Sequence, residues 1–269
     1  MNLLRWLFGD TEEAATHGVP LYYEPFRVPL SLHRAAVGVR TPVDGDGSRA
    51  VTALGLAPGE TALFIAGGAG KMEPHEMQRT RPLLLEGLLR FAEDHHIAVV
   101  DGGTDAGVMK LIGDAHAERG YPFPLVGVAP VGAVRFPGYD NPDGVPLNGG
   151  HTHLVLTDGD RFGAESDMIV RVAAGLARGG RDRIFGVVIN GGEVTRQETY
   201  ARAITPNRSI PMLVLEGSGR FGDELASALR GIAPDDPRTA AIVATGDLRL
   251  ASADDGPERL YTVLRQFLP

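Results

Sequence analysis

The sequence has no cysteine among its 269 residues. Disulfide bonds, thiolate catalysis and cysteine-based metal sites are therefore excluded, and the absence is consistent with a cytoplasmic protein. The sequence also has no excess of basic residues, since 26 lysines and arginines stand against 34 acidic residues and give a net charge of -8. Proteins that bind nucleic acids or membrane surfaces usually carry a basic face, so we expect neither kind of partner.

No apolar run approaches the roughly 20 residues that a membrane span requires. The apolar stretch at the start, MNLLRWLFG, is short, and Arg5 interrupts it. It also lacks the basic segment that precedes the apolar part of a secretory signal. We expect a short helix here that packs Leu3, Leu4, Trp6 and Leu7 onto the rest of the protein, which we place in the cytoplasm.

Short apolar runs recur from Thr61 onward, and most are continuous rather than alternating, which is typical of strands covered on both faces. Helical patterns over 77–96, 106–120, 165–180 and 221–231 lie between or after them. This alternation predicts right-handed βαβ units in an α/β fold, with a mostly parallel sheet and helices on both faces. The predicted strands are TALFIA (61–66), IAVV (97–100), PLVGVAP (124–130), THLVLT (152–157), IFGVVIN (184–190) and IPMLVLE (210–216).

We expect residues 1–269 to form a single domain, because no segment has the composition of a linker. Residues 1–55 break the strand–helix rhythm with scattered prolines, and we interpret them as an N-terminal extension wrapped on the core. The tail over 239–269 is expected to form a strand, a short acidic turn and a last helix.

Glycine is abundant, with 36 residues, and its clusters follow the predicted strands. The carboxyl ends of parallel strands meet at one edge of a sheet, where α/β proteins bind ligands. Glycine lets a ligand approach the backbone, and a helix that starts beyond each loop offers unpaired N–H groups to a phosphate. Tight turns alone would also explain one such cluster, but five at one edge favour a ligand site. The clusters are GGAGK (67–71), GGTDAG (102–107), DGDRFG (158–163), NGG (190–192) and GSGR (217–220).

Two common phosphate-binding fingerprints are absent. A P-loop requires a glycine where this sequence has Ile65, and Met72 follows Gly70–Lys71 in place of serine or threonine. Neither GGAGKME nor GGTDAGV matches G-x-G-x-x-G, the dinucleotide-binding pattern.

Five segments over residues 60–230 together resemble the SLOG-type domain, which occurs at the N-terminus of TRPM cation channels and in free-standing prokaryotic relatives. They are GGAGKM, GGTDAGVMKLIGDA, VGVAPVGAV, HTHLVLTDGDRFGAE and LEGSGRFGDELA, in that order. The wider superfamily includes the LONELY GUY phosphoribohydrolases. The resemblance implies a Rossmann-like fold that binds a nucleotide or a nucleotide-derived ligand such as ADP-ribose, with no other cofactor.

The resemblance also implies ligand contacts in four loops, among which Arg220 is the strongest candidate because its planar fork can clamp phosphate or ribose oxygens. Channel versions that bind ADP-ribose carry another arginine where this sequence has Ile169, and Arg171, Arg161 or Lys71 would have to replace it. The implied contacts are Gly67, Gly68, Ala69 and Gly70, then Gly102, Gly103, Thr104 and Gly107, then Phe162, Gly163 and Glu165, and finally Gly217, Ser218, Gly219 and Arg220.

An enzymatic alternative follows from the phosphoribohydrolase branch, whose hallmark is PGGxGTxxE. The corresponding stretch TDGDRFGAESD has lost most of that pattern, so we favour a sensor that binds the ligand without cleaving it. In the alternative, Glu165 or Asp167 would catalyse cleavage of the base–ribose bond. A third hypothesis is a scaffold that forms homo-oligomers or binds a separate effector protein.

A metal site is not expected. His151 and His153 alternate along a predicted strand, with Asp158 and Asp160 nearby, but this spacing is not characteristic of metal ligands. Histidines that orient the neighbouring loop, or that lie near a base, are the preferred interpretation.

Overall fold

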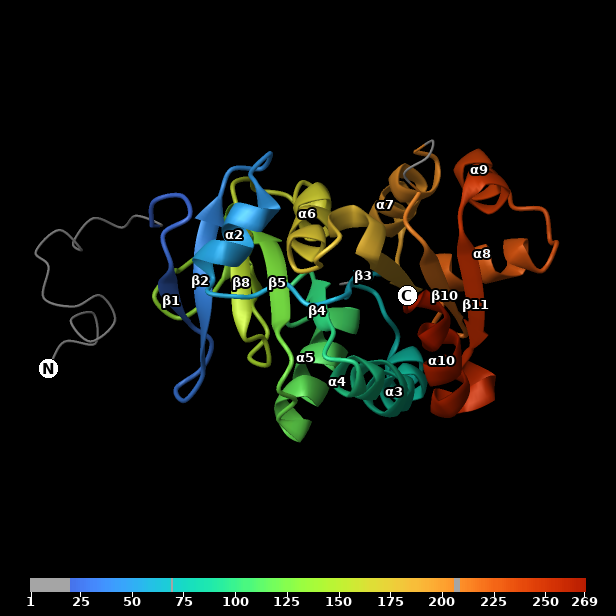
Figure 1. Cartoon of the computed structure of the whole chain (residues 1–269), viewed down its shortest axis with the longest axis horizontal. Helices are drawn as coiled ribbons and strands as arrows, with labels where there is room; N and C mark the ends of the chain where they lie inside the picture. Colours follow the sequence, from blue (N-terminus) through green and yellow to red (C-terminus); the bar gives the residue numbers. More distant parts are fainter. Residues whose placement is uncertain (1–19, 69, 206–208) are drawn as a thin grey trace, which may run out of the picture.

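The computed structural model describes residues 20–68, 70–205 and 209–269 (Figure 1). A nine-stranded sheet runs through it in the order β1-β2-β8-β5-β4-β3-β9-β10-β11. Only the pair β1–β2 is antiparallel, and the other neighbouring pairs are parallel. The helix expected around Trp6 and the predicted contact Ala69 lie outside the described residues.

Six strands coincide with the six predicted apolar runs. Every residue of β5 and β9 is buried, which explains why these runs are continuous rather than alternating. A small two-stranded sheet, β6 (Val134–Arg135) and β7 (Val145–Pro146), follows β5. The strands of the main sheet are β1 (Phe26–Pro29), β2 (Ala35–Thr41), β3 (Ala62–Gly67), β4 (Ala98–Asp101), β5 (Leu125–Pro130), β8 (His153–Thr157), β9 (Ile184–Ile189), β10 (Met212–Glu216) and β11 (Leu248–Ser252).

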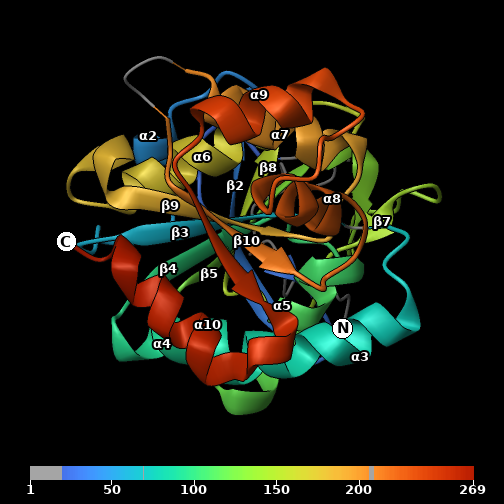
Figure 2. The ribbon, with the colours of Figure 1, turned by 90° about the vertical axis from the view of Figure 1, so that its right-hand side faces the viewer.

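Helices cover both faces of the sheet (Figure 2), as predicted, and the fold is a Rossmann-like α/β fold. One face carries α3 (Pro74–Leu83), its π-helical continuation (Leu84–Leu89), α4 (Arg90–Asp94), α5 (Gly107–Arg119) and α10 (Gly256–Leu264). The opposite face carries α2 (Gly47–Ala53), α6 (Ser166–Gly175), α7 (Glu193–Ala203), α8 (Arg220–Leu229) and α9 (Pro237–Thr245).

The sequence pattern of α5 shows why these helices form where they do. Its residues Val108, Leu111, Ile112 and Ala115 recur at helical spacing, and all four are buried against the sheet. The helix ends at Gly120, whose φ of 66° is a left-handed conformation that glycine adopts without strain.

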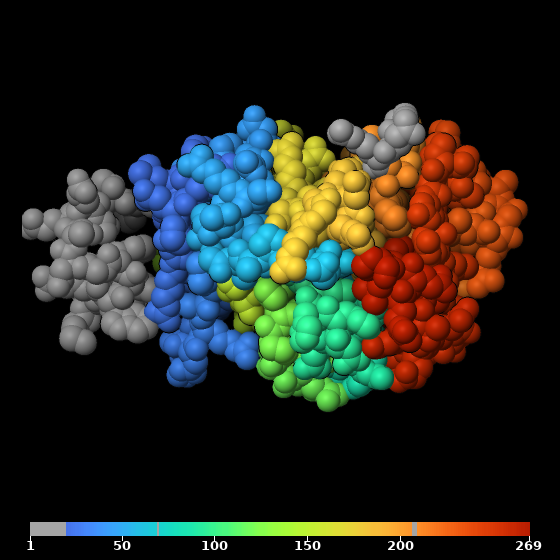
Figure 3. Space-filling model, viewed as in Figure 1, coloured from blue at the N-terminus to red at the C-terminus, as the bar shows by residue number. Residues whose placement is uncertain are grey.

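The N-terminal segment differs from the expected extension, because residues 26–53 are part of the main architecture. Strand β2 pairs with β8 over five residues, and β1 pairs with β2. Helix α2 packs so closely on α6 that a Cβ on Gly47 would lie 2.3 Å from the main chain of Arg171. Figure 3 shows this segment in contact with α6 on the molecular surface.

Three helices were not predicted. Helix α2 lies between β2 and β3, α7 follows β9, and α9 occupies the start of the tail, ahead of the expected strand (β11) and last helix (α10). Three connections between elements therefore contain helices where the sequence pattern predicted none.

Candidate functional site

The sheet changes the direction of its connections between β3 and β9. Strand β3 leads to α3 on one face, whereas its neighbour β9 leads to α7 on the other face. In α/β proteins such a switch leaves a crevice outside the carboxyl ends of the strands, and ligands bind there. The glycine-rich loops 67–71 and 190–192 flank this point.

Arg220 connects three of the predicted loops. It is the first residue of α8, and its Nη1 donates a hydrogen bond to the Gly70 carbonyl oxygen at 3.1 Å. Its guanidinium also lies over Gly192, where an added Cβ would be 2.4 Å from Nη2. The side chain is exposed, so the loop after β10 presents an accessible positive charge above the loops after β3 and β9.

Asn190, which the sequence analysis did not single out, joins the loops after β9 and β10. It is fully buried with a φ of 54°. Its main-chain N–H donates to Ser218 Oγ at 2.8 Å, and its Nδ2 donates to the Ser218 carbonyl at 2.7 Å. Ser218 Oγ in turn donates to the Leu215 carbonyl at 2.6 Å. The predicted ligand contact Ser218 is therefore already engaged in holding the two loops together.

Glu76 of α3 places a carboxylate beside Gly219, the residue that precedes Arg220. One oxygen accepts hydrogen bonds from Asn190 Nδ2 at 3.0 Å and from the Glu73 N–H at 2.8 Å. The other oxygen lies so close to Gly219 that an added Cβ would be 1.9 Å away. The start of α8 therefore has a hydrogen-bond acceptor, the Glu76 carboxylate, as well as a cation, the Arg220 guanidinium. The site around Arg220 is for this reason not uniformly positive. The capping pattern Glu73-x-x-Glu76 is visible in the sequence, but it indicates only a helix start.

The last residue of β4 and the loop after it contain two buried polar atoms that have no hydrogen-bond partner within the described residues. They are Thr104 Oγ1 and Asp101 Oδ2. Such atoms are normally satisfied, and ligands or water are usual partners. The main-chain N–H of Val108 donates to the Gly68 carbonyl at 3.1 Å, so this loop adjoins the loop after β3. No side chain caps the start of α5, so first-turn N–H groups other than that of Val108 are available to an acceptor.

His151 orients this loop, in line with the interpretation preferred from the sequence. Its Nε2 lies 2.8 Å from Asp101 Oδ1, and the same oxygen accepts the Gly103 N–H at 2.7 Å. Burial alone would lower the pKa of His151, but the Asp101 carboxylate raises it. His153 instead contacts Thr152, and within the described residues no group of three or more potential ligands could hold a metal ion.

Glu165 and Asp167, the two candidate catalytic acids, lie in different environments. Glu165 is 6% exposed, and burial raises its pKa to about 7, although a hydrogen bond from the Gly163 N–H (2.7 Å) opposes this shift. The Asp167 side chain is exposed and forms an ion pair with Arg202 at 3.3 Å. Glu165 therefore has the burial and the pKa of a group that exchanges protons near neutral pH.

A pocket of about 280 Å³ opens between the 158–165 loop and α7. Glu198 and Ser166 line this pocket, and the Ser166 hydroxyl donates a hydrogen bond to the Glu198 carboxylate. Burial raises the pKa of Glu198. Phe162 is 38% exposed at this site, and a Cβ on Gly163 would lie 3.5 Å from Val194. The pocket is lined by Phe162, Gly163, Ser166, Val194, Gln197, Glu198 and Arg202.

The three candidate replacement cations have different surroundings. Arg171 Nη1 donates to the Gly45 carbonyl at 3.2 Å and therefore holds the loop between β2 and α2. The Arg161 side chain is 90% exposed beside Asp160. Lys71 is exposed, with no side-chain hydrogen bond or ion pair to the part of the chain that the structure describes.

Gly67 is the last residue of β3 and Gly107 the first residue of α5, whereas Gly102 and Gly217 lie in the loops after β4 and β10. Gly107 and Gly217 have positive φ values of 53° and 82°, which explains glycine at these two turns. A Cβ on Gly217 would lie 2.7 Å from Arg79 Nη2, so a second arginine borders the loop after β10.

Comparisons with known proteins show which sequences and structures this chain is similar to. A family model described as SLOG in TRPM, prokaryote, matches residues 60–262. A transient receptor potential channel of Caenorhabditis elegans is 26% identical over 226 residues, which cover 70% of this chain and 11% of the channel. The chain thus spans about a tenth of the length of that relative.

Among solved structures, the X-ray structure of TM1055, a structural genomics target, matches with a TM-score of 0.48 and 20% identity over 77% of this chain and 99% of that chain. Within the described residues, no helix is both long and apolar enough to cross a membrane.

Proposed function

Because this chain belongs to the family described as SLOG in TRPM, prokaryote, we propose that it binds a nucleotide or a nucleotide-derived ligand at the carboxyl edge of its sheet. The observation that carries the proposal is the position of Arg220. Its exposed guanidinium contacts the loop after β3 and lies over the loop after β9, where the sheet changes the direction of its connections.

The surrounding groups support a phosphate-containing ligand. A guanidinium binds phosphate oxygens in a bidentate manner, and the uncapped start of α5 offers main-chain N–H groups nearby. The unpartnered Thr104 hydroxyl and the free oxygen of Asp101 are suited to further polar atoms of the same ligand.

Glu76 favours a nucleotide over inorganic phosphate. Its carboxylate repels an anion but accepts hydrogen bonds from hydroxyl groups, as a ribose diol provides. A ligand that presents a diphosphate next to ribose hydroxyls, such as ADP-ribose, satisfies Arg220 and Glu76 together. We therefore propose an ADP-ribose-like ligand and a role as a sensor, whose output passes to a separate effector protein or to a second copy of the chain.

Calorimetric titration with ADP-ribose, AMP and NAD tests this proposal. We expect Arg220→Gln to weaken binding at least tenfold, since a charged hydrogen-bonding group is lost from the ligand contact. The matched control is Arg119→Gln, because Arg119 is exposed at the opposite end of α5 and pairs with Glu86. The proposal fails if none of the three compounds binds at millimolar concentration, or if both variants bind the ligand equally well.

A second candidate function is N-glycosidase activity, which the environment of Glu165 favours. A buried carboxyl with a pKa of about 7 is half deprotonated at neutral pH and can take a proton from water. That water would add to C1′ of the ribose while the bond to the base breaks. With AMP, the proton taken up by Glu165 would pass to the leaving adenine; with NAD, nicotinamide would leave as a neutral molecule and the proton would go to solvent.

Chromatographic detection of free base from AMP or NAD tests this second function. We expect Glu165→Gln to abolish the release, whereas Asp167→Asn retains it because Asp167 is an exposed partner of Arg202. Binding of the intact nucleotide with no release at any pH would leave the sensor as the supported function.

A further inference from the structure

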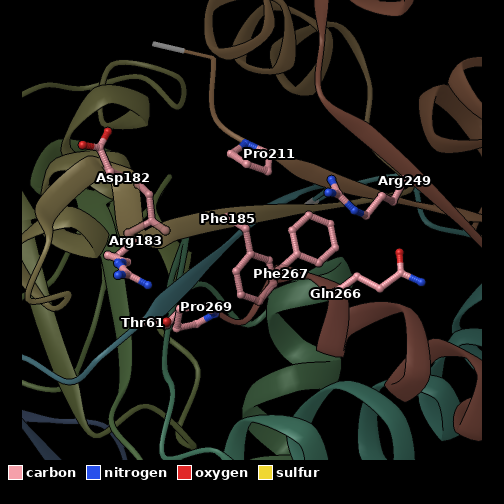
Figure 4. Close-up of a pocket in the computed structure, with 10 residues that line it drawn as sticks. Thr61, Asp182, Arg183, Phe185, Pro211, Arg249, Gln266, Phe267 and Pro269 are labelled. Atoms are coloured by element: carbon pink, nitrogen blue, oxygen red, sulfur yellow. The ribbon is translucent and has the colours of Figure 1, made fainter. Parts of the chain in front are cut away.

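The two edges of the sheet differ in the groups that they bury. At the amino edge, the rings of Phe185 and Phe267 stack with their centroids 4.7 Å apart, and the Arg249 guanidinium carbon lies 4.6 Å from the Phe267 centroid (Figure 4). These side chains pack against one another. The carboxyl edge instead contains a histidine and a carboxylate in contact, His151 and Asp101, and both side chains are fully buried.

Both ring nitrogens of His151 face hydrogen-bond acceptors. Nε2 lies 2.8 Å from Asp101 Oδ1, and Nδ1 lies 3.3 Å from the Asn148 carbonyl oxygen. A neutral imidazole has one N–H and a lone pair on its other nitrogen, so it can donate to one of these acceptors but not to both. An imidazolium donates from both nitrogens. The two contacts therefore fit the protonated ring.

Asp101 supplies the negative charge that a buried imidazolium requires. Burial opposes the charge on His151, but the Asp101 carboxylate outweighs this effect, and the pKa of His151 is raised above its ordinary value of 6.5. The Asp101 oxygen that contacts the ring also accepts the Gly103 N–H at 2.7 Å. The charge pair is thus linked directly to the glycine-rich loop 102–107.

The other histidines and the arginine near this pair cannot take over the role of Asp101. His116 of α5 lies close enough to His151 for their charges to interact, and burial lowers the pKa of His116. Burial also lowers the pKa of His153, two residues further along β8. Arg34 is a cation that donates to two main-chain carbonyls at 3.3 Å. None of these groups offers a negative charge, so the charge on His151 depends on Asp101.

Three further charged groups surround the Asn148 side chain. Its Nδ2 donates to Asp105 Oδ1 at 2.9 Å and to Asp114 Oδ1 at 3.0 Å. Lys110 Nζ forms ion pairs with the same two acids, at 3.1 and 2.9 Å. These side chains are partly exposed, so water screens their effect on the buried ring of His151. They hold Asn148 in place, and Asn148 in turn is an acceptor for the ring.

Two main-chain hydrogen bonds join the 102–107 loop to the 146–151 segment, in which His151 lies. The Asp105 N–H donates to the Pro146 carbonyl at 2.7 Å, and the Asn148 N–H donates to the Gly103 carbonyl at 2.9 Å. The charge pair adds a third connection, because it joins the same two segments through its side chains. A change in the charge of His151 therefore acts on the contact between the loop and this segment.

We propose that protonated His151 holds the 102–107 loop in the shape that faces the ligand, and that the loop loosens when a rise in pH removes this proton. Deprotonation leaves one ring nitrogen without a hydrogen to donate and leaves Asp101 buried without its cation, which is costly. Because the pKa of His151 in the folded protein is raised, the stabilisation is complete below pH 6.5 and is lost as the pH rises through the raised value.

The effect on ligand binding rests on the nucleotide site proposed above, to which the loop belongs. The effect on the loop itself does not, so it is tested first, by NMR of the full chain without ligand. The ¹⁵N shifts of the two ring nitrogens are nearly equal in an imidazolium and widely different in a neutral ring. We expect the charged form of His151 at about pH 7 and the neutral form at about pH 10.

Hydrogen exchange of the Asp105 and Asn148 amides measures the contact between the loop and the 146–151 segment. After correction for the chemical rate of exchange, the protection of both amides should fall about tenfold as the His151 ring loses its proton. Asp101→Asn keeps an acceptor for the Gly103 N–H but removes the charge, so the ring should be neutral at about pH 7 and the protection should no longer depend on pH. His153→Gln is the matched control and should keep the pH dependence.

Calorimetric titration with ADP-ribose over the same pH range extends the test to the ligand site. ADP-ribose is preferred to AMP, because a phosphate monoester changes its own charge near about pH 6. We expect the affinity to fall about tenfold as His151 deprotonates, and to vary little with pH in Asp101→Asn. Glu165 also titrates, with a pKa of about 7, so the fall must persist in Glu165→Gln.

The inference is overturned if the His151 ring is neutral at about pH 7, if it stays charged at about pH 10, or if both amides keep their protection while the ring titrates. An affinity that does not follow the titration of the ring would also overturn it. If no ADP-ribose binds at any pH, the proposed nucleotide site fails, whereas the exchange result still decides whether His151 holds the loop.

Discussion

Glu165 buries a carboxyl group that accepts main-chain hydrogen bonds and has no ion pair among the described residues. Its pKa in the folded protein is about 7, against an ordinary value of 4.5 for a glutamate carboxyl. The folded state therefore binds more protons than the unfolded state between these two values, so stability falls as the pH rises through this window. At 1.36 kcal/mol per pKa unit, the loss reaches roughly 3 kcal/mol above pH 7.

Glu165→Gln removes this pH dependence, because glutamine keeps an acceptor for the Gly163 N–H and has no charge to desolvate. We expect the variant to be more stable than the unaltered chain at pH 8, by up to about 3 kcal/mol, and equally stable near pH 4.5. Urea unfolding at the two pH values measures the difference. Glu24→Gln, at an exposed position, is the control and should change neither value. Equal stability of both chains at pH 8 would show that Glu165 is not buried as described.

The sequence analysis singled out Arg220 and Glu165 but not Asn190 and Glu76, and the reason is physical. The family resemblance implied Arg220 and Glu165, and Gly217-Ser218-Gly219 at a predicted strand end marks a loop before Arg220. Asn190 matters because its left-handed backbone and its amide join two loops that are 28 residues apart in the sequence. Glu76 reaches α8 only because α3 packs there. Whether the predicted residues bind a ligand stays a prediction.

The strands were predictable to the extent that they are buried on both faces. Continuous apolar runs marked β3, β4, β5, β8, β9 and β10 within two residues of their observed starts. Strand β1 was missed because it is short, lies at the edge of the sheet and ends in proline. Helix α7, EVTRQETYARA, has so few apolar residues that its sequence shows no clear helical stripe.

In helix α5, helix propensity and close packing predict opposite effects of replacing Gly113 by alanine. A Cβ on Gly113 would lie 1.8 Å from Asn148 Oδ1, and a Cβ on Gly150 would lie 1.8 Å from the Gly113 carbonyl oxygen. Replacing glycine by alanine inside an exposed helix usually stabilises it by about 1 kcal/mol. Here we expect Gly113→Ala to destabilise the protein by about 2 kcal/mol, because the helix must move away from the segment 148–150.

The comparison for this prediction is Ala117→Gly, which lies in the same helix at a half-buried position. It should lower stability by about 1 kcal/mol through propensity alone. Both variants are measured by urea unfolding. A stabilising effect of Gly113→Ala would mean that α5 does not approach residues 148–150 this closely.

At the scale of the whole molecule, the family match over 60–262 does not include every element of the sheet. Strands β1 and β2 and helix α2 lie before it, yet β2 pairs with β8 and α2 covers α6. The side chains of Val39, Val51 and Leu54 are buried in the same core cluster as β3 and α6. The segment before the family match is therefore part of the folded core rather than an addition to it.

A chain reduced to residues 60–269 tests this conclusion. Fully burying each large aliphatic side chain contributes about 1.5–3 kcal/mol, and the whole protein is stable by only about 5–15 kcal/mol, so losing β2 and α2 should remove most of the stability. We expect the shortened chain to lose its cooperative thermal transition and to bind a dye that reports exposed apolar surface. Val39→Asp in the full-length chain should act in the same direction, because it places a charge in the core next to β8. If residues 60–269 instead unfold cooperatively at the melting temperature of the full chain, then β1, β2 and α2 contribute nothing to the stability of the sheet.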